Sequence, residues 1–148
     1  MITMLGEARK VSKTVVGDAD SLIALSYKDD PSHLNAKKII EQLTSKKFEI
    51  IYPNTAILEA ITALKRGLDL PNEAHLINKQ YQTGNFMVKF VDQNIQLRAS
   101  QRFEKTVSKK NTIFDAVVAE VAVELKAEYI FSFDKWYLKE GFQLAPEN

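Results

Sequence analysis

Short runs of β-branched and apolar residues alternate along the chain with longer stretches in which apolar residues recur every three or four positions. The short runs are typical of buried strands, and the longer stretches are typical of amphipathic helices. Four strands and a shorter fifth are predicted at 14–18, 48–53, 85–92, 128–134 and 141–145. Helices are predicted at 20–27, 29–46, 54–67, 71–84, 94–109 and 111–127.

This alternation of strands and helices favours a parallel sheet covered by helices on both faces. We therefore expect an α/β fold, a single three-layer α/β/α domain with a mainly parallel sheet of about five strands. The domain is predicted to occupy residues 13–148. Residues 1–12 carry no sustained apolar pattern, and chain ends are often poorly ordered, so we expect a flexible N-terminal arm there.

The composition is that of an ordinary globular protein, with 148 residues, 45% hydrophobic and 26% charged. A formal net charge of +1 is no strongly basic nucleic-acid signature, so contact with a polyanion must come from a local patch. The absence of cysteine excludes disulfides, thiolate zinc sites and cysteine nucleophiles. No run of about 18 apolar residues is free of charge and no signal peptide is recognisable, so a cytoplasmic protein without a membrane span is expected.

Acidic residues stand at the ends of elements or inside strongly apolar helices. Asp18 and Asp134 end the first and fourth predicted strands. Ligands of open parallel sheets bind at the carboxyl ends of the strands, so both side chains are expected in the same crevice. Asp115 lies in the first turns of the most apolar predicted helix, and almost all neighbours of Glu59 in its helix are apolar.

Each acid also has an ordinary structural explanation. Asp20 suits a helix cap, and Asp115 suits the positive end of a helix dipole. Asp134 suits a turn cap, and Glu59 suits a solvated helix position. A functional site is absent only if all these explanations hold together.

A cluster of three or four carboxylates repels itself strongly unless a cation is bound. Oxygen ligands without His or Cys favour Mg²⁺ or Mn²⁺ over zinc. Such sites commonly act on phosphate esters, where the metal polarises the phosphoryl oxygen and activates water. The acids therefore indicate metal-dependent chemistry on a phosphate ester.

Four segments resemble, in the same order, the motifs of PIN-domain ribonucleases, the fold of the VapC toxins. They are VVGDADSLIAL at 15–25, LEAITAL at 58–64, FDAVVAEVAVEL at 114–125 and YIFSFDKWY at 129–137. Ala19 and Ser132 stand where this family usually has threonine, and Ser132 keeps the hydroxyl. The motifs span nearly the whole predicted domain, and the four together are more specific than any one of them.

The resemblance implies a Mg²⁺- or Mn²⁺-dependent endoribonuclease that needs no side-chain nucleophile. Such enzymes are frequently homodimers and are frequently inhibited by an antitoxin protein as the toxin of a toxin–antitoxin pair. The catalytic and metal-binding residues implied by the motifs are Asp18, Glu59, Asp115 and Asp134. Asp20 and Ser132 are expected to be auxiliary, as a further ligand or as hydrogen-bond partners.

An RNA substrate must also be held through its phosphates. Three lysines are best placed for this. Lys135 is next to Asp134, and Lys109 and Lys110 come just before the predicted helix that contains Asp115. Trp136 and Tyr137 either stack on a base or pack against the core.

Two other functions are kept open. The stretch from Asp18 to Asp20 also resembles the start of haloacid-dehalogenase phosphatases, with Asp18 as nucleophile and Asp20 as general acid–base. That alternative leaves Glu59 and Asp115 unexplained. The second alternative is a PIN-like module that binds RNA or a protein without cutting.

Overall fold

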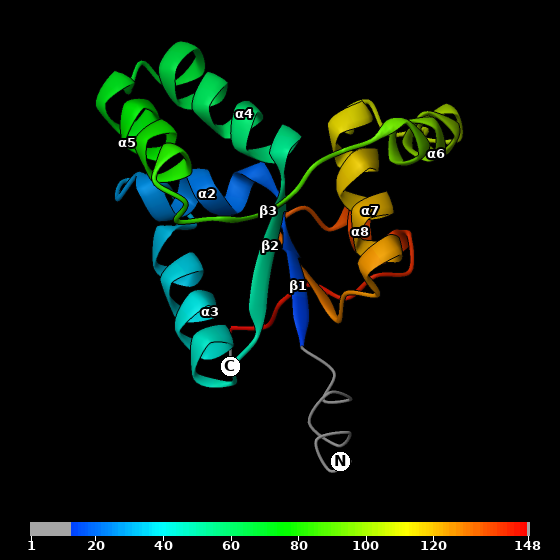
Figure 1. Ribbon diagram of the computed structural model, residues 1–148, viewed down its shortest axis with the longest axis horizontal. Helices are drawn as coiled ribbons and strands as arrows, with labels where there is room; N and C mark the ends of the chain where they lie inside the picture. The colour runs from blue at the N-terminus through cyan, green and yellow to red at the C-terminus, as the bar shows by residue number, and fades with distance from the viewer. Residues whose placement is uncertain (1–12, 148) are drawn as a thin grey trace.

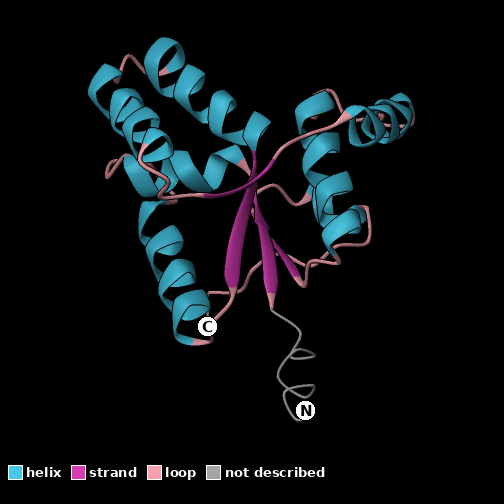
Figure 2. Ribbon diagram, viewed as in Figure 1, coloured by secondary structure: helices cyan, strands magenta, loops and turns pink. Residues whose placement is uncertain are grey.

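The computed structural model describes residues 13–147, and its four strands form one sheet in the order β3-β2-β1-β4 (Figures 1 and 2). The strands are β1 (Thr14–Gly17), β2 (Glu49–Pro53), β3 (Met87–Lys89) and β4 (Tyr129–Phe131). All three strand pairings are parallel, which confirms the predicted α/β class with a mainly parallel sheet. The arm predicted for residues 1–12 lies outside the described residues and stays a prediction.

Helices cover both faces of the sheet, as the alternating pattern predicts (Figure 1). They are α2 (Ala19–Ser26), α3 (His33–Ser45), α4 (Asn54–Thr62), α5 (Pro71–Gln82), α6 (Gln93–Glu104), α7 (Ile113–Leu125) and α8 (Trp136–Lys139). Helix α4 continues into a π-helical turn, η1 (Ala63–Gly67). Helices α2 to α5 lie on one side of the sheet, and α6, α7 and α8 lie on the other (Figure 1).

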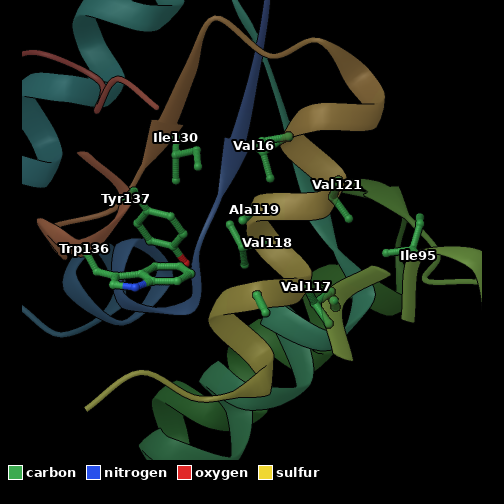
Figure 3. Packing of buried hydrophobic residues seen from close by; sticks show 12 residues of the cluster. Val16, Ile95, Val117, Val118, Ala119, Val121, Ile130, Trp136 and Tyr137 are labelled. Carbon is green, nitrogen blue, oxygen red and sulfur yellow. The ribbon is translucent and has the colours of Figure 1, made fainter. Parts of the chain in front are cut away.

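Side chains of β1 alternate between these two layers, as the period of a strand requires. Val15 packs in the cluster that contains α3, and Val16 packs in the cluster that contains α7. Figure 3 shows α7 between the sheet, which contributes Val16 and Ile130, and α6, which contributes Ile95. Because α6 covers its outer side, α7 is apolar on more than one face.

The C-terminal part corrects two details of the predicted fold. Residues 141–145 do not form a fifth strand: they make a single parallel bridge, between Leu144 and Ile130. The bridge consists of two backbone hydrogen bonds, from the Ile130 N–H to the Gln143 carbonyl and from the Ala145 N–H to the Ile130 carbonyl, each at 2.9 Å. The short helix α8 was not predicted; it begins where the backbone N–H of Trp136 donates to the Asp134 side chain at 2.9 Å.

The close approach of Gly17 and Tyr52 fixes the backbone just before Asp18. A Cβ atom at position 17 would overlap the ring of Tyr52. The Tyr52 hydroxyl lies 2.8 Å from the Ser21 hydroxyl in a buried hydrogen bond. Glycine therefore lets β2 pack tightly against the end of β1, where the first acid emerges.

Candidate active site

Asp18 is buried at the carboxyl end of β1, and both of its carboxylate oxygens accept hydrogen bonds. Its Oδ1 accepts the Ala19 N–H at 2.7 Å, which makes Asp18 the N-cap of α2. Its Oδ2 accepts the Tyr137 hydroxyl at 2.8 Å and the Ser132 hydroxyl at 3.2 Å. Three donors from two separate parts of the chain thus fix this carboxylate.

Asp20 connects the start of α2 to the loop after β4. Its Oδ2 accepts the Phe133 N–H at 2.8 Å and the Ser132 hydroxyl at 3.0 Å. Its Oδ1 is buried and has no hydrogen-bond partner. The capping role that the sequence suggests for Asp20 belongs to Asp18, so Asp20 is free to act at the site.

Asp115 and Asp134 share one donor, the side-chain amide of Asn111. This nitrogen donates to Oδ2 of Asp115 at 3.1 Å and to Oδ2 of Asp134 at 2.8 Å. Asp115 Oδ2 also accepts the Thr112 N–H at 2.9 Å, within a capping box at the start of α7. Asp115 therefore does stabilise the start of its helix, as one interpretation of the sequence suggested. The same carboxylate also lies beside the other acids.

Glu59 reaches the cluster from α4, on the other side of the sheet from α7. Its Oε1 is buried and has no hydrogen-bond partner. Burial, together with the charges of Asp115 and Asp20, raises the pKa of Glu59 from 4.5 to about 7. A solvated helix position does not describe this side chain.

Asp18, Asp20 and Asp115 also have raised pKa values, and burial is the largest cause for each. Burial raises the pKa of Asp18 well above its ordinary 3.8, and the charges of Asp20 and Asp115 add to this. Burial also raises the pKa of Asp20 to about 6 and raises that of Asp115. The five acids of the site are Asp18, Asp20, Glu59, Asp115 and Asp134. They lie close enough together for their charges to repel one another, as expected from the sequence.

The donor chemistry of this cluster fits a hard divalent cation. All five side chains offer carboxylate oxygen, and Asp20 and Glu59 each keep a buried oxygen without a partner. Among residues 13–147, no group of three or more Asp, Glu or His side chains is arranged so that it could hold a metal ion. Mg²⁺ usually keeps several waters and binds one or two carboxylates directly, so it needs no closed cage.

The sequence did not indicate that two residues, Asn111 and Tyr137, donate hydrogen bonds to the acids. Asn111 is buried just before α7, where a polar residue had no evident partner in the sequence. Tyr137 follows the fourth motif, and one of its two suggested roles, packing against the core, is confirmed. Burial raises the pKa of Tyr137 above its ordinary value, so its hydroxyl stays protonated and donates to Asp18.

The predicted lysines differ in their position. Lys110 and Lys135 line a cleft of about 520 Å³ that also contains Asp20 and Asp134, whereas exposed Lys109 does not line it. Trp136 contributes to the wall of the cleft, but its side chain is buried and packs edge-on against Tyr137. Trp136 is therefore not a stacking platform for a base.

The fold and the acidic cluster are those of one family of proteins, and a comparison with family models identifies it. Residues 15–139 match the PIN domain model. The chain belongs to the PIN-domain family. Among solved structures it is similar to VapC20 of Mycobacterium tuberculosis, a toxin described as cleaving the sarcin-ricin loop. The TM-score is 0.76 with 19% sequence identity, over 89% of this chain and 99% of VapC20. No curated protein sequence matches the chain significantly.

The family match favours the PIN interpretation over the phosphatase alternative. The geometry agrees, because a nucleophilic carboxylate needs an oxygen free to attack, and both oxygens of Asp18 are engaged in a buried position. No helix of the described chain combines the length and the apolar character that a membrane crossing requires.

Proposed function

We propose that this protein is an endoribonuclease that uses Mg²⁺ or Mn²⁺ to hydrolyse RNA phosphodiester bonds. The observation that carries the proposal is the convergence of five carboxylates, two with buried unpartnered oxygens, at the carboxyl ends of β1 and β4. Such a charge cluster is costly unless a cation compensates it. The residues proposed to hold the metal, directly or through water, are Asp18, Glu59, Asp115 and Asp134, with Asp20 as auxiliary.

When bound, the cation supplies positive charge that polarises a phosphodiester and lowers the pKa of water. The other contributions come from the chain itself. Ser132 and Tyr137 orient Asp18, and the Phe133 N–H and Ser132 orient Asp20. The lysines that line the cleft beside the acids are proposed to contact the phosphates of a substrate.

The proposed biological setting is supported by the family and by the likeness to VapC20, which is described as a toxin that cleaves the sarcin-ricin loop. We propose that this chain is likewise the toxin of a toxin–antitoxin pair, with ribosomal or transfer RNA as candidate substrates. The antitoxin, the homodimer and the cytoplasmic location all stay predictions.

Metal removal provides the test of the proposed activity. A panel of labelled total RNA, tRNA and ribosomal RNA fragments should be cut at discrete positions with Mg²⁺ or Mn²⁺ and left intact in EDTA. Restoring the metal after chelation should restore cleavage, which separates loss of the cofactor from loss of the fold. Cleavage that persists in EDTA would contradict the metal site. A folded protein that binds the RNAs in metal without cutting any of them would favour the non-catalytic alternative.

Asn111→Ala should weaken Mn²⁺ binding by about 10- to 100-fold, the usual effect of removing a hydrogen-bond partner of metal ligands. Without the shared amide, Asp115 and Asp134 lose the donor that holds their oxygens toward one point. Isothermal titration with Mn²⁺ measures the effect directly. Asn94→Ala, at an exposed position of α6, is the control and should bind Mn²⁺ like the wild type. Equal affinity of both variants would remove Asn111 from the site.

A further inference from the structure

A lysine-lined cleft opens directly beside the acidic cluster. Its volume is about 520 Å³, and its walls come from two segments, 108–111 before α7 and 133–139 after β4. Lys110, Lys135 and Lys139 line it, and Asp20 and Asp134 of the acidic site line it as well. The cleft and the site therefore form one continuous surface. Lys139, on α8, has no counterpart among the lysines singled out from the sequence.

The three lysines of this cleft are free to meet a ligand. None of them takes part in the ion pairs formed within residues 13–147. A second hollow with basic side chains, about 330 Å³, contrasts with this. There Arg102 is paired with Glu120 at 2.6 Å and with Glu140 at 2.8 Å. Arg98 of that hollow is paired as well, so Lys105 is the one lining cation there without an ion pair among the described residues, against three in the lysine-lined cleft.

A nucleic acid strand that approaches the acids needs these free cations. Five carboxylates repel a polyanion, and a net charge of +1 provides no long-range attraction. Phosphate contacts from lysines supply most of the affinity of sequence-independent nucleic-acid binding. Since Asp20 and Asp134 stand in the same cleft, a strand held there passes next to the acidic site.

We propose that Lys110, Lys135 and Lys139 bind backbone phosphates of single-stranded RNA next to the phosphate that is cut. The proposal rests on the proposed ribonuclease function, because that function places the reacting phosphate at the acids. It adds Lys139 as a binding residue, and it confines the RNA strand to the lysine-lined cleft, a channel between the segments 108–111 and 133–139. These lysines contact phosphate and not bases, so they position the strand without selecting its sequence.

Binding of a labelled 12-nucleotide single-stranded RNA tests the proposal, measured by fluorescence anisotropy in EDTA so that no cleavage occurs. Wild type is compared with Lys110→Ala, Lys135→Ala and Lys139→Ala over a range of monovalent salt. Each variant should bind about five- to tenfold more weakly at 50 mM salt. The slope of log affinity against log salt should also fall by about 0.7, the value for one single-strand phosphate contact. Lys139→Arg, which keeps the charge, should restore binding.

Lys38→Ala is the matched control. Lys38 is exposed on α3, which lies on the opposite side of the sheet from α7 and α8 (Figure 1). Its removal should leave both the affinity and the salt slope unchanged. Single-stranded DNA of the same sequence should show the same losses in the three cleft variants, because the lysines do not read the 2′-hydroxyl.

The outcomes separate this proposal from the ribonuclease function. A wild type that does not bind the RNA, or cleft variants that keep the wild-type salt slope, overturns the lysine channel even if RNA is cut in metal. Equal losses in Lys38→Ala and Lys139→Ala overturn it too, because binding is then diffuse. Cleft-specific losses support the channel even if no RNA of the panel is ever cut, in which case only the catalytic proposal fails.

Discussion

Asp115→Asn should lower the rate of RNA cleavage by about 10²- to 10³-fold, because it removes a proposed ligand of the cation whose positive charge stabilises the transition state. The substitution removes one negative charge from the cluster while preserving the start of α7. Asp115 Oδ2 accepts from Asn111 and Thr112, and an asparagine can place its carbonyl oxygen at that position. Its amide group then takes the place of Oδ1, where it cannot ligate a cation.

Single-turnover cleavage with saturating Mn²⁺ measures the rate of the chemical step for this variant. Thermal unfolding in EDTA should show Asp115→Asn folded and no less stable than wild type, because a repelling charge has been removed. Glu41→Gln, at an exposed position of α3, is the charge-matched control and should cleave like the wild type. A folded Asp115→Asn protein with the wild-type rate would exclude Asp115 from the catalytic site.

The sequence was sufficient for the layers of the fold because periodicity reports burial. The β-branched run that contains Val15 and Val16 is buried on both faces, as in any central parallel strand. The predicted fifth strand failed for a different reason. Residues 141–145 have the apolar composition of a strand, but pairing depends on how much edge β4 exposes, and that is set by tertiary structure.

The acids of the site could be predicted because their positions along the sequence are unusual: they stand at strand ends or among apolar helix neighbours. Of their supporting partners, Ser132 was expected from the sequence, but two others were not. Asn111 and Tyr137 are 26 residues apart in the chain; Asn111 donates to Asp115 and Asp134, and Tyr137 donates to Asp18. Nothing in their local sequence indicates a carboxylate partner, since a buried amide or hydroxyl is recognisable only when its acceptor is located. The role of Lys139 was not predicted either, because its position in the cleft depends on helix α8, which was not predicted.

Without metal, the stability of this protein should fall as the pH rises from about 4.5 to about 7. Asp20 and Glu59 have pKa values of about 6 and about 7 in the folded chain, above their ordinary values of 3.8 and 4.5. In this range the unfolded chain loses protons that the folded chain keeps, so unfolding becomes more favourable. Solvent screening of the partly exposed Glu59 reduces the effect, and we expect about 2–3 kcal/mol between pH 5 and pH 8. For a chain of this length, that is about 5–10 °C in melting temperature.

Divalent cations should reverse this dependence, because they bind the deprotonated acids and only in the folded chain. Melting curves at pH 5, 6.5 and 8 in EDTA, in 10 mM Mg²⁺ and in Na⁺ of equal ionic strength measure both effects. Mg²⁺ should raise the melting temperature far more at pH 8 than at pH 5, and Na⁺ should do so at neither. Glu59→Gln should flatten the curve in EDTA, because it removes one of the repelling acids. A melting temperature that rises with pH in EDTA would mean that the acids are not in mutual repulsion. The negative charges that destabilise the metal-free protein at neutral pH are therefore the same charges that attract a divalent cation.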